Sequence, residues 1–195
     1  MSAPIVIYQP VLDFWFGTPD SVEYGKSRSC WFTKSDEFDS LIRERFGSQV
    51  SAALDGRHES WLAAPASALA YIITLDQFTR NIFRGQAAAF SGDARALAAA
   101  RLMVAKRWDQ GLPPVQRSFC YLPFEHSENL ADQDESVRLY GLLDADPKPG
   151  GLLEWAVKHR DIIVRFGRFP HRNETLRRAS TPEEHEFLKQ PGSRF

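Results

Sequence analysis

Apolar residues recur at intervals of three and four along most of the chain, and the strict alternation typical of strands is scarce. This spacing predicts helices near Gln9–Phe16, Phe38–Phe46, Pro65–Phe83, Gly92–Gln110, Asp132–Leu143, Leu152–Phe166 and Pro182–Gln190. The last of these follows a capping box, Thr181 to Glu184, with proline at the first helical position. The most open break, 144–151, is expected to be a loop between helices. We therefore predict an all-α fold, with residues 1–195 forming a single domain of antiparallel helix pairs.

The predicted helix at Pro65–Phe83 carries charge on a face that should be buried. At 100° per residue, one stripe holds Leu69, Ile72, Ile73, Asp76, Arg80 and Phe83, and the opposite side is apolar too. An unpaired buried charge is costly, so Asp76 and Arg80 need partners, and they can pair with each other across one turn. One carboxylate cannot use all five guanidinium N–H groups. Asn81 and Arg84 extend the same polar group.

A complementary pattern lies in the predicted helix at Leu152–Phe166 and in the turn after it. His159 lies on the apolar face, where a single histidine is more typical of a core than of a metal site. A polar stripe at i, i+4 and i+7 and the turn after Phe169-Pro170 add six residues: Asp161, Arg165, Arg168, His171, Arg172 and Asn173. The stripe alone fits an ordinary solvated face equally well, because surface ion pairs are common and weak.

The segment from Tyr121 to Glu128 lies between these two helices in the sequence. Pro123 is expected to start a helical turn, which would place Glu125 and Glu128 on one side. Glu125, His126, Glu128 and His171 are metal-ligand types, but their spacing matches no zinc or di-iron motif, so we predict no metal and no cofactor. The chain also has no phosphate-binding loop and no dinucleotide fingerprint.

If the three segments converge, five arginines meet four carboxylates with histidines near by. Such a group is either a structural ion-pair network or a pocket for an anion, since guanidinium forks match carboxylate and phosphate geometry. The predicted ligand-binding set is Asp76, Arg80, Asn81, Arg84, Asp161, Arg165, Arg168, His171, Arg172 and Asn173. One hypothesis is a helical protein that binds an anionic small molecule or peptide. A second is a hydrolase with Glu125, His126 or Glu128 as acid or base. A third is a structural network in a protein-interaction module.

Composition narrows the partners further. The chain has 195 residues, 43% hydrophobic and 25% charged, and a formal net charge of −1. This balance argues against nonspecific binding to nucleic acid or to an anionic membrane surface, although it leaves room for a local basic pocket. The two cysteines form no CxxC pair. With no secretory signal and no apolar run of membrane-spanning length, we expect a soluble cytoplasmic protein. The sequence leaves the oligomeric state open.

Five stretches resemble an uncharacterised bacterial family, domain of unknown function 924. They are LDFWFG at 12–17, WF at 31–32, LDQFTRNIFRG at 75–85, LPFEHSENLADQ at 122–133 and RFGRFPHRN at 165–173. The resemblance runs from about Val11 to the C-terminal tail. It implies an all-helical fold related to tetratricopeptide repeats, and it implies no established activity or cofactor.

Two positions depart from the family pattern. Thr79 stands where the pattern usually has proline, and this change should favour an unbroken helix, because proline removes a helical hydrogen bond. Arg177 stands where the pattern would place glycine, which puts a tight turn after Leu176 in doubt.

Overall fold

The protein is all-helical in every part that its computed structural model describes, residues 7–143 and 151–194, where no residue lies in a strand. None of the helices in these ranges is long and apolar enough to cross a membrane. The chain divides into an N-terminal unit, Met1–Arg84 with Ala88–Pro123, and a C-terminal unit, Gly85–Ala87 with Phe124–Phe195. The prediction of an all-α fold is thus confirmed. The single domain, the antiparallel pairing and the tetratricopeptide-like arrangement stay predictions.

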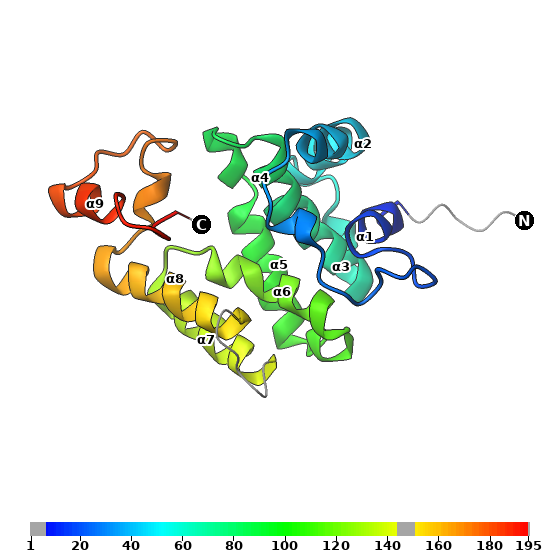
Figure 1. The fold of residues 1–195 in the computed structure, drawn as a ribbon. Helices are drawn as coiled ribbons and strands as arrows, with labels where there is room; N and C mark the ends of the chain where they lie inside the picture. The colour runs from blue at the N-terminus through cyan, green and yellow to red at the C-terminus, as the bar shows by residue number, and fades with distance from the viewer. Residues whose placement is uncertain (1–6, 144–150, 195) are drawn as a thin grey trace, which may run out of the picture. The chain divides into compact units, whose positions relative to one another are not determined.

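The N-terminal unit is built around aromatic side chains. Its helices are α1 (Gln9–Phe16), α2 (Asp36–Leu54), α3 (Pro65–Ile72), the π-helix η3 (Ile73–Phe78), α4 (Thr79–Ile82), α5 (Asp93–Ala105) and all but the end of α6 (Pro114–Glu125) (Figure 1). Short 3₁₀ turns lie at Ser29–Trp31, Glu59–Ala63, Ala87–Phe90 and Asp109–Gly111. Trp15, 1% exposed, contacts Phe78 and Phe119 at ring-centroid distances of 5.6 and 5.7 Å. Such edge-to-face packing adds to the stabilisation that burial alone provides.

The predicted helix at Pro65–Phe83 forms as a helical run that is unbroken from Pro65 to Ile82, but its middle is a π-helix. Thr79 begins α4 and its hydroxyl donates to the Leu75 carbonyl at 2.7 Å, so the expected continuity is confirmed. The π-turn of η3 was not predicted, because the apolar spacing was counted at the α-helical 100° per residue.

Two helix boundaries differ from the prediction. α2 begins earlier, because Ser35 caps it by accepting from the Phe38 amide, and it ends later, because Val50 and Ala53 continue its buried face beyond Phe46. α5 ends at Ala105 rather than near Gln110. Two residues after Ala105, Arg107 takes a left-handed conformation with φ of 55°. The Trp108 amide then donates to the Met103 carbonyl, which closes a Schellman motif.

The predicted turn start at Pro123 is wrong. Pro123 lies inside α6, which begins at Pro114 and ends at Glu125. α6 therefore ends just before His126, and Glu128 lies in the segment between α6 and α7.

The C-terminal unit contains α7 (Leu130–Leu143), α8 (Leu152–Phe166), the 3₁₀ turn η6 (Pro170–Arg172) and α9 (Pro182–Phe187), and α7 packs beside α8 (Figure 1). Its core includes Ile162, Ile163 and Phe169, with Phe166 and Phe187 packed against them. The capping box is confirmed, since the Thr181 hydroxyl accepts from the Glu184 amide, while the helix is shorter than predicted and ends at Phe187. The predicted loop at 144–151 lies outside the described residues except for Gly151.

The turn after Leu176 is present although arginine stands there. Arg177 has φ of 55°, and the Arg178 amide donates to the Asn173 carbonyl at 2.8 Å, the pattern of a second Schellman motif. The left-handed conformation costs an arginine about 1–2 kcal/mol, which glycine avoids.

Arg177→Gly should therefore raise the free energy of unfolding. The expected increase is about 0.5–1 kcal/mol, because the relief of strain is partly offset by the larger conformational entropy that glycine loses on folding. Urea unfolding followed by circular dichroism measures the change. Arg177→Ala is the matched control, because it removes the guanidinium but keeps the strain, and it should leave stability nearly unchanged. Equal stabilisation by both variants would show that the destabilising effect of Arg177 comes from its guanidinium and not from its backbone conformation.

Candidate functional site

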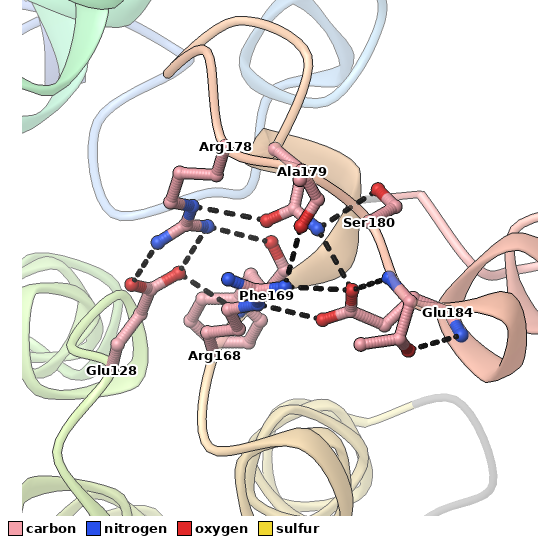
Figure 2. Close-up of polar contacts among 9 residues, drawn as sticks. Glu128, Arg168, Phe169, Arg178, Ala179, Ser180 and Glu184 are labelled. Atoms are coloured by element: carbon pink, nitrogen blue, oxygen red, sulfur yellow. Dashed lines mark hydrogen bonds and ion pairs between the residues drawn. The ribbon is translucent and has the colours of Figure 1, made fainter.

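Arg178 is the centre of a hydrogen-bond network in the C-terminal unit (Figure 2). Its guanidinium donates to both oxygens of Glu128, at 2.6 and 2.9 Å. It also donates to the Phe169 carbonyl at 3.1 Å and to Asn173 Oδ1 at 3.0 Å. Four contacts of this kind fix both the orientation and the position of a planar guanidinium. Arg178 thereby joins the loop after η6 to the segment that follows α6.

Glu128 is ionised at neutral pH. Its carboxylate accepts from Arg178 and, at 2.8 Å, from the Phe169 amide. Burial alone would raise the pKa of Glu128, but the hydrogen bonds from Arg178 and from the Phe169 amide outweigh burial and hold that pKa below its ordinary value. A carboxylate held in this way has no proton to donate near neutral pH.

Arg168 and Glu184 form a second pair, which fixes α9. The guanidinium of Arg168 donates to the two carboxylate oxygens at 2.7 and 2.8 Å (Figure 2). The Thr181 amide and the Asn173 side chain donate to the same carboxylate at 2.7 and 3.2 Å. The hydrogen bond from Arg168 is the main cause that lowers the pKa of Glu184 to about 2. Asn173 therefore connects both pairs, since it also accepts from Arg178.

Histidines gather beside these pairs. His159, 6% exposed, has Nδ1 at 2.9 Å from the Trp155 carbonyl and 3.2 Å from Glu125 Oε1. Burial, with smaller effects from His126, Arg172 and His171, lowers the pKa of His159 to about 3, although the hydrogen bond with the Trp155 carbonyl acts in the opposite direction. Burial likewise lowers the pKa of His171 to about 3, with Arg172 next in effect. The imidazoles of His159 and His171 are therefore neutral at physiological pH.

A pocket opens in the same unit, with a volume of about 680 Å³. We call it the C-terminal pocket, and its lining is Pro170, His171, Glu174, Arg178, Ser180, His185, Leu188, Lys189 and Arg194. Arg178 lines this pocket, but its guanidinium already donates to Glu128, Phe169 and Asn173. Lys189 donates to Glu186 at the surface, and within the described residues no carboxylate pairs with Arg194.

The sequence-predicted residues fall into two groups. Asp76, Arg80, Asn81 and Arg84 lie in the N-terminal unit, whereas the other predicted residues lie in the C-terminal unit. Arg80 donates to both oxygens of Asp93 at 2.9 and 3.1 Å and contacts Asp76 at 3.2 Å. Asn81 and Arg84 both donate to Asp39, Arg84 through two bonds of 2.6 and 2.8 Å.

Within the C-terminal unit, the structure brings together the segments that hold Glu125, Glu128 and the turn at 169–173. Arg172 is buried, with its guanidinium 4.5 Å from the centre of the Phe169 ring. Asp161 and Arg165 lie apart from this group. Arg165 donates to Glu183 at the surface, and the side chain of Asp161 is 67% exposed.

Of the predicted residues, only His171 lines the C-terminal pocket. Sequence reasoning missed the other polar residues of the lining: Glu174, Arg178, Ser180, His185, Lys189 and Arg194. One signal for them was present in the sequence. From 158 to 194 there are nine lysine and arginine residues against five aspartate and glutamate residues, whereas the whole chain has a net charge of −1. This local excess of positive charge marks the C-terminal segment as the basic part of the protein.

Among residues 7–143 and 151–194, no three histidine, cysteine, aspartate or glutamate side chains are grouped so that they could hold a metal ion.

The fold and the charged network of the described residues define an all-helical protein whose two units each contain arginine–carboxylate pairs. The sequence model of a bacterial protein family of unknown function, DUF924, matches residues 11–192, and the chain belongs to this family. A solved structure of a protein of unknown function from Agrobacterium tumefaciens is similar, with 37% sequence identity and a TM-score of 0.79. The similarity covers 94% of this chain and 97% of that one. A search of curated proteins found no match.

Proposed function

We propose that this protein binds an anionic small molecule or peptide in the C-terminal pocket. The observation that carries the proposal is the lining itself, in which Arg194 adds a positive charge that no carboxylate of the described residues pairs with, beside Lys189, which is paired with Glu186 outside the lining. The volume of about 680 Å³ falls within the roughly 300–1,000 Å³ of small-molecule sites.

Neutral donors complete the recognition of an anion. The Ser180 hydroxyl accepts from the Asn173 side chain at 3.0 Å, so its own proton is available to a ligand. His171 is neutral and therefore adds no charge to the lining. The Arg168–Glu184 pair holds α9, and Asn173 connects that pair to Arg178, so the pocket is supported by hydrogen bonds before any ligand enters. Preorganisation of this kind lowers the entropic cost of binding.

Three of the arginines predicted from the sequence are engaged by carboxylates, and this favours a structural role for them. Arg80, Arg84 and Arg168 each make a two-bond contact with a carboxylate of their own unit. This matches the third hypothesis, a structural network, for these three side chains. The hydrolase hypothesis has less support, because Glu128 is held as a carboxylate and Glu125 is 5% exposed.

Calorimetric titration with inorganic phosphate, succinate and an acidic dipeptide tests the proposal. At least one probe should bind wild type, and Arg194→Ala should weaken that probe by at least tenfold, about 1.4 kcal/mol. Arg165→Ala is the matched control, because it removes an exposed arginine of the same unit that does not line the pocket. Binding that is equally weakened in both variants would indicate nonspecific attraction to positive charge. Absence of binding by all three probes would contradict the proposal.

A further inference from the structure

The C-terminal pocket also contains a negative charge that the network does not use. Glu174 lines the pocket with an exposed carboxylate, and within the described residues no hydrogen bond or ion pair engages that carboxylate. The residue before it, Asn173, is 1% exposed and bonded to Ser180, Glu184 and Arg178. Glu174 therefore projects from an anchored backbone, unlike a side chain on a loose loop.

Glu174 and the cations reach the pocket from different segments. Glu174 follows η6, whereas Lys189 and Arg194 follow α9. No ion pair in the described part of the chain joins Glu174 to either cation, so opposite charges line one pocket without neutralising each other. Such an arrangement is complementary to a ligand with two charged ends, and it disfavours a ligand that carries only negative charge.

Glu174 also lines a neighbouring pocket of about 910 Å³ in the same unit. The other lining residues of that pocket are Gly85, Gln86, Ala87, Thr175, Leu176 and Arg177. Glu174 is thus the shared wall of two pockets, which leaves space for the rest of a ligand whose ammonium group contacts Glu174.

We propose that the ligand is zwitterionic: an amino acid or short peptide whose free ammonium group pairs with Glu174 and whose carboxylate pairs with Arg194 and Lys189. This inference rests on the proposed function, because the ligand still binds Arg194 through an anionic group, and it adds an ammonium group to that ligand. A pure dianion would satisfy the cations but would bring like charge towards Glu174.

The dipeptide Ala-Leu and two blocked forms separate these cases by calorimetric titration. Wild type should bind Ala-Leu at least tenfold more tightly than N-acetyl-Ala-Leu and at least tenfold more tightly than Ala-Leu-amide. Glu174→Gln should remove the first preference and retain the second, and Arg194→Ala should do the reverse. Glu183→Gln is the control, because Glu183 is exposed, pairs with Arg165 and does not line the pocket.

The two proposals fail in different ways. If phosphate or succinate binds through Arg194 while N-acetylation of Ala-Leu has no effect, anion binding stands and the zwitterion is wrong. The same conclusion follows if Glu174→Gln behaves as Glu183→Gln does. If neither the anions nor Ala-Leu binds, both proposals fail.

Discussion

Replacing Gly92 by alanine is expected to lower the free energy of unfolding by about 3 kcal/mol, at the upper end of what overpacking costs. Gly92 precedes α5, and a Cβ placed there would lie 2.2 Å from the Leu75 carbonyl oxygen and 2.9 Å from its carbon. Both atoms belong to the backbone of η3, so no side-chain rotation relieves the overlap. The two backbones must separate, or the start of α5 must distort.

Thermal unfolding measures this effect, which corresponds to roughly 6–12 °C in midpoint at about 2–4 °C per kcal/mol for a chain of this size. Gly47→Ala is the matched control. Gly47 lies inside α2, and a Cβ there meets no atom within 4 Å, so alanine should stabilise the protein by up to about 1 kcal/mol. A midpoint for Gly92→Ala within 2 °C of wild type would show that η3 and α5 do not need this close approach.

Acidification from pH 6.5 to pH 5 is expected to destabilise the protein strongly, through buried histidines. In the folded protein the pKa values of His159 and His171 are about 3, below the value of about 6.5 in an unfolded chain. Between these values the unfolded chain binds more protons, so stability falls as pH falls. The slope rises from about half of 1.4 kcal/mol per pH unit at pH 6.5 towards the full value at pH 5, so each histidine contributes about 1.6 kcal/mol over this interval, or about 3 kcal/mol for both.

Urea unfolding at pH 6.5 and pH 5 tests this dependence in wild type and in His159→Gln. The variant should lose about half of the pH effect. His58 also has a pKa lowered by burial and contributes in the same interval, so the difference between the two proteins is the quantity to compare. Glu184, with its pKa of about 2, stabilises the fold fully above about pH 4.5, and this contribution is lost as the pH falls towards 2. That loss lies below the interval from pH 6.5 to pH 5 and does not affect the comparison. An unchanged pH effect in His159→Gln would contradict a neutral buried His159.

The sequence predicted those features that depend on near neighbours. The capping box at Thr181 needs only residues three apart, and it forms as expected. The charge at Asp76 and Arg80 was correctly recognised as needing partners, and their contact at 3.2 Å exists. Arg80 also donates two hydrogen bonds to Asp93, however, and Asp93 belongs to another helix. Helical periodicity identifies which face is buried, but it does not identify the side chain that lies opposite.

The candidate site depends mostly on long-range pairs, and for this reason the sequence revealed little of it. Arg178 and Glu128 are fifty positions apart, and no local pattern connects them. The pocket lining is set by how the chain returns after α9, which brings Arg194 near His171. Glycine was the expected residue for the left-handed turn, and Arg177 shows that backbone hydrogen bonds can enforce such a turn on another residue.

The π-turn of η3 gives this helix a place where its length can change. A π-helix holds one more residue per hydrogen-bonded ring than an α-helix, so η3 is equivalent to a single insertion within a regular helix. Removing one residue of Ile73–Phe78 would convert the π-turn into a regular α-helix and would leave the buried faces of α3 and α4 in place. Without a π-turn to absorb it, the same deletion would rotate α3 by about 100° relative to α4. α3 packs on α1 and α5, whereas α4 packs on α2, so such a rotation would expose one buried face or the other. In an alignment of relatives, a one-residue gap at η3 should therefore be read as the loss of the π-turn and not as a repacked core.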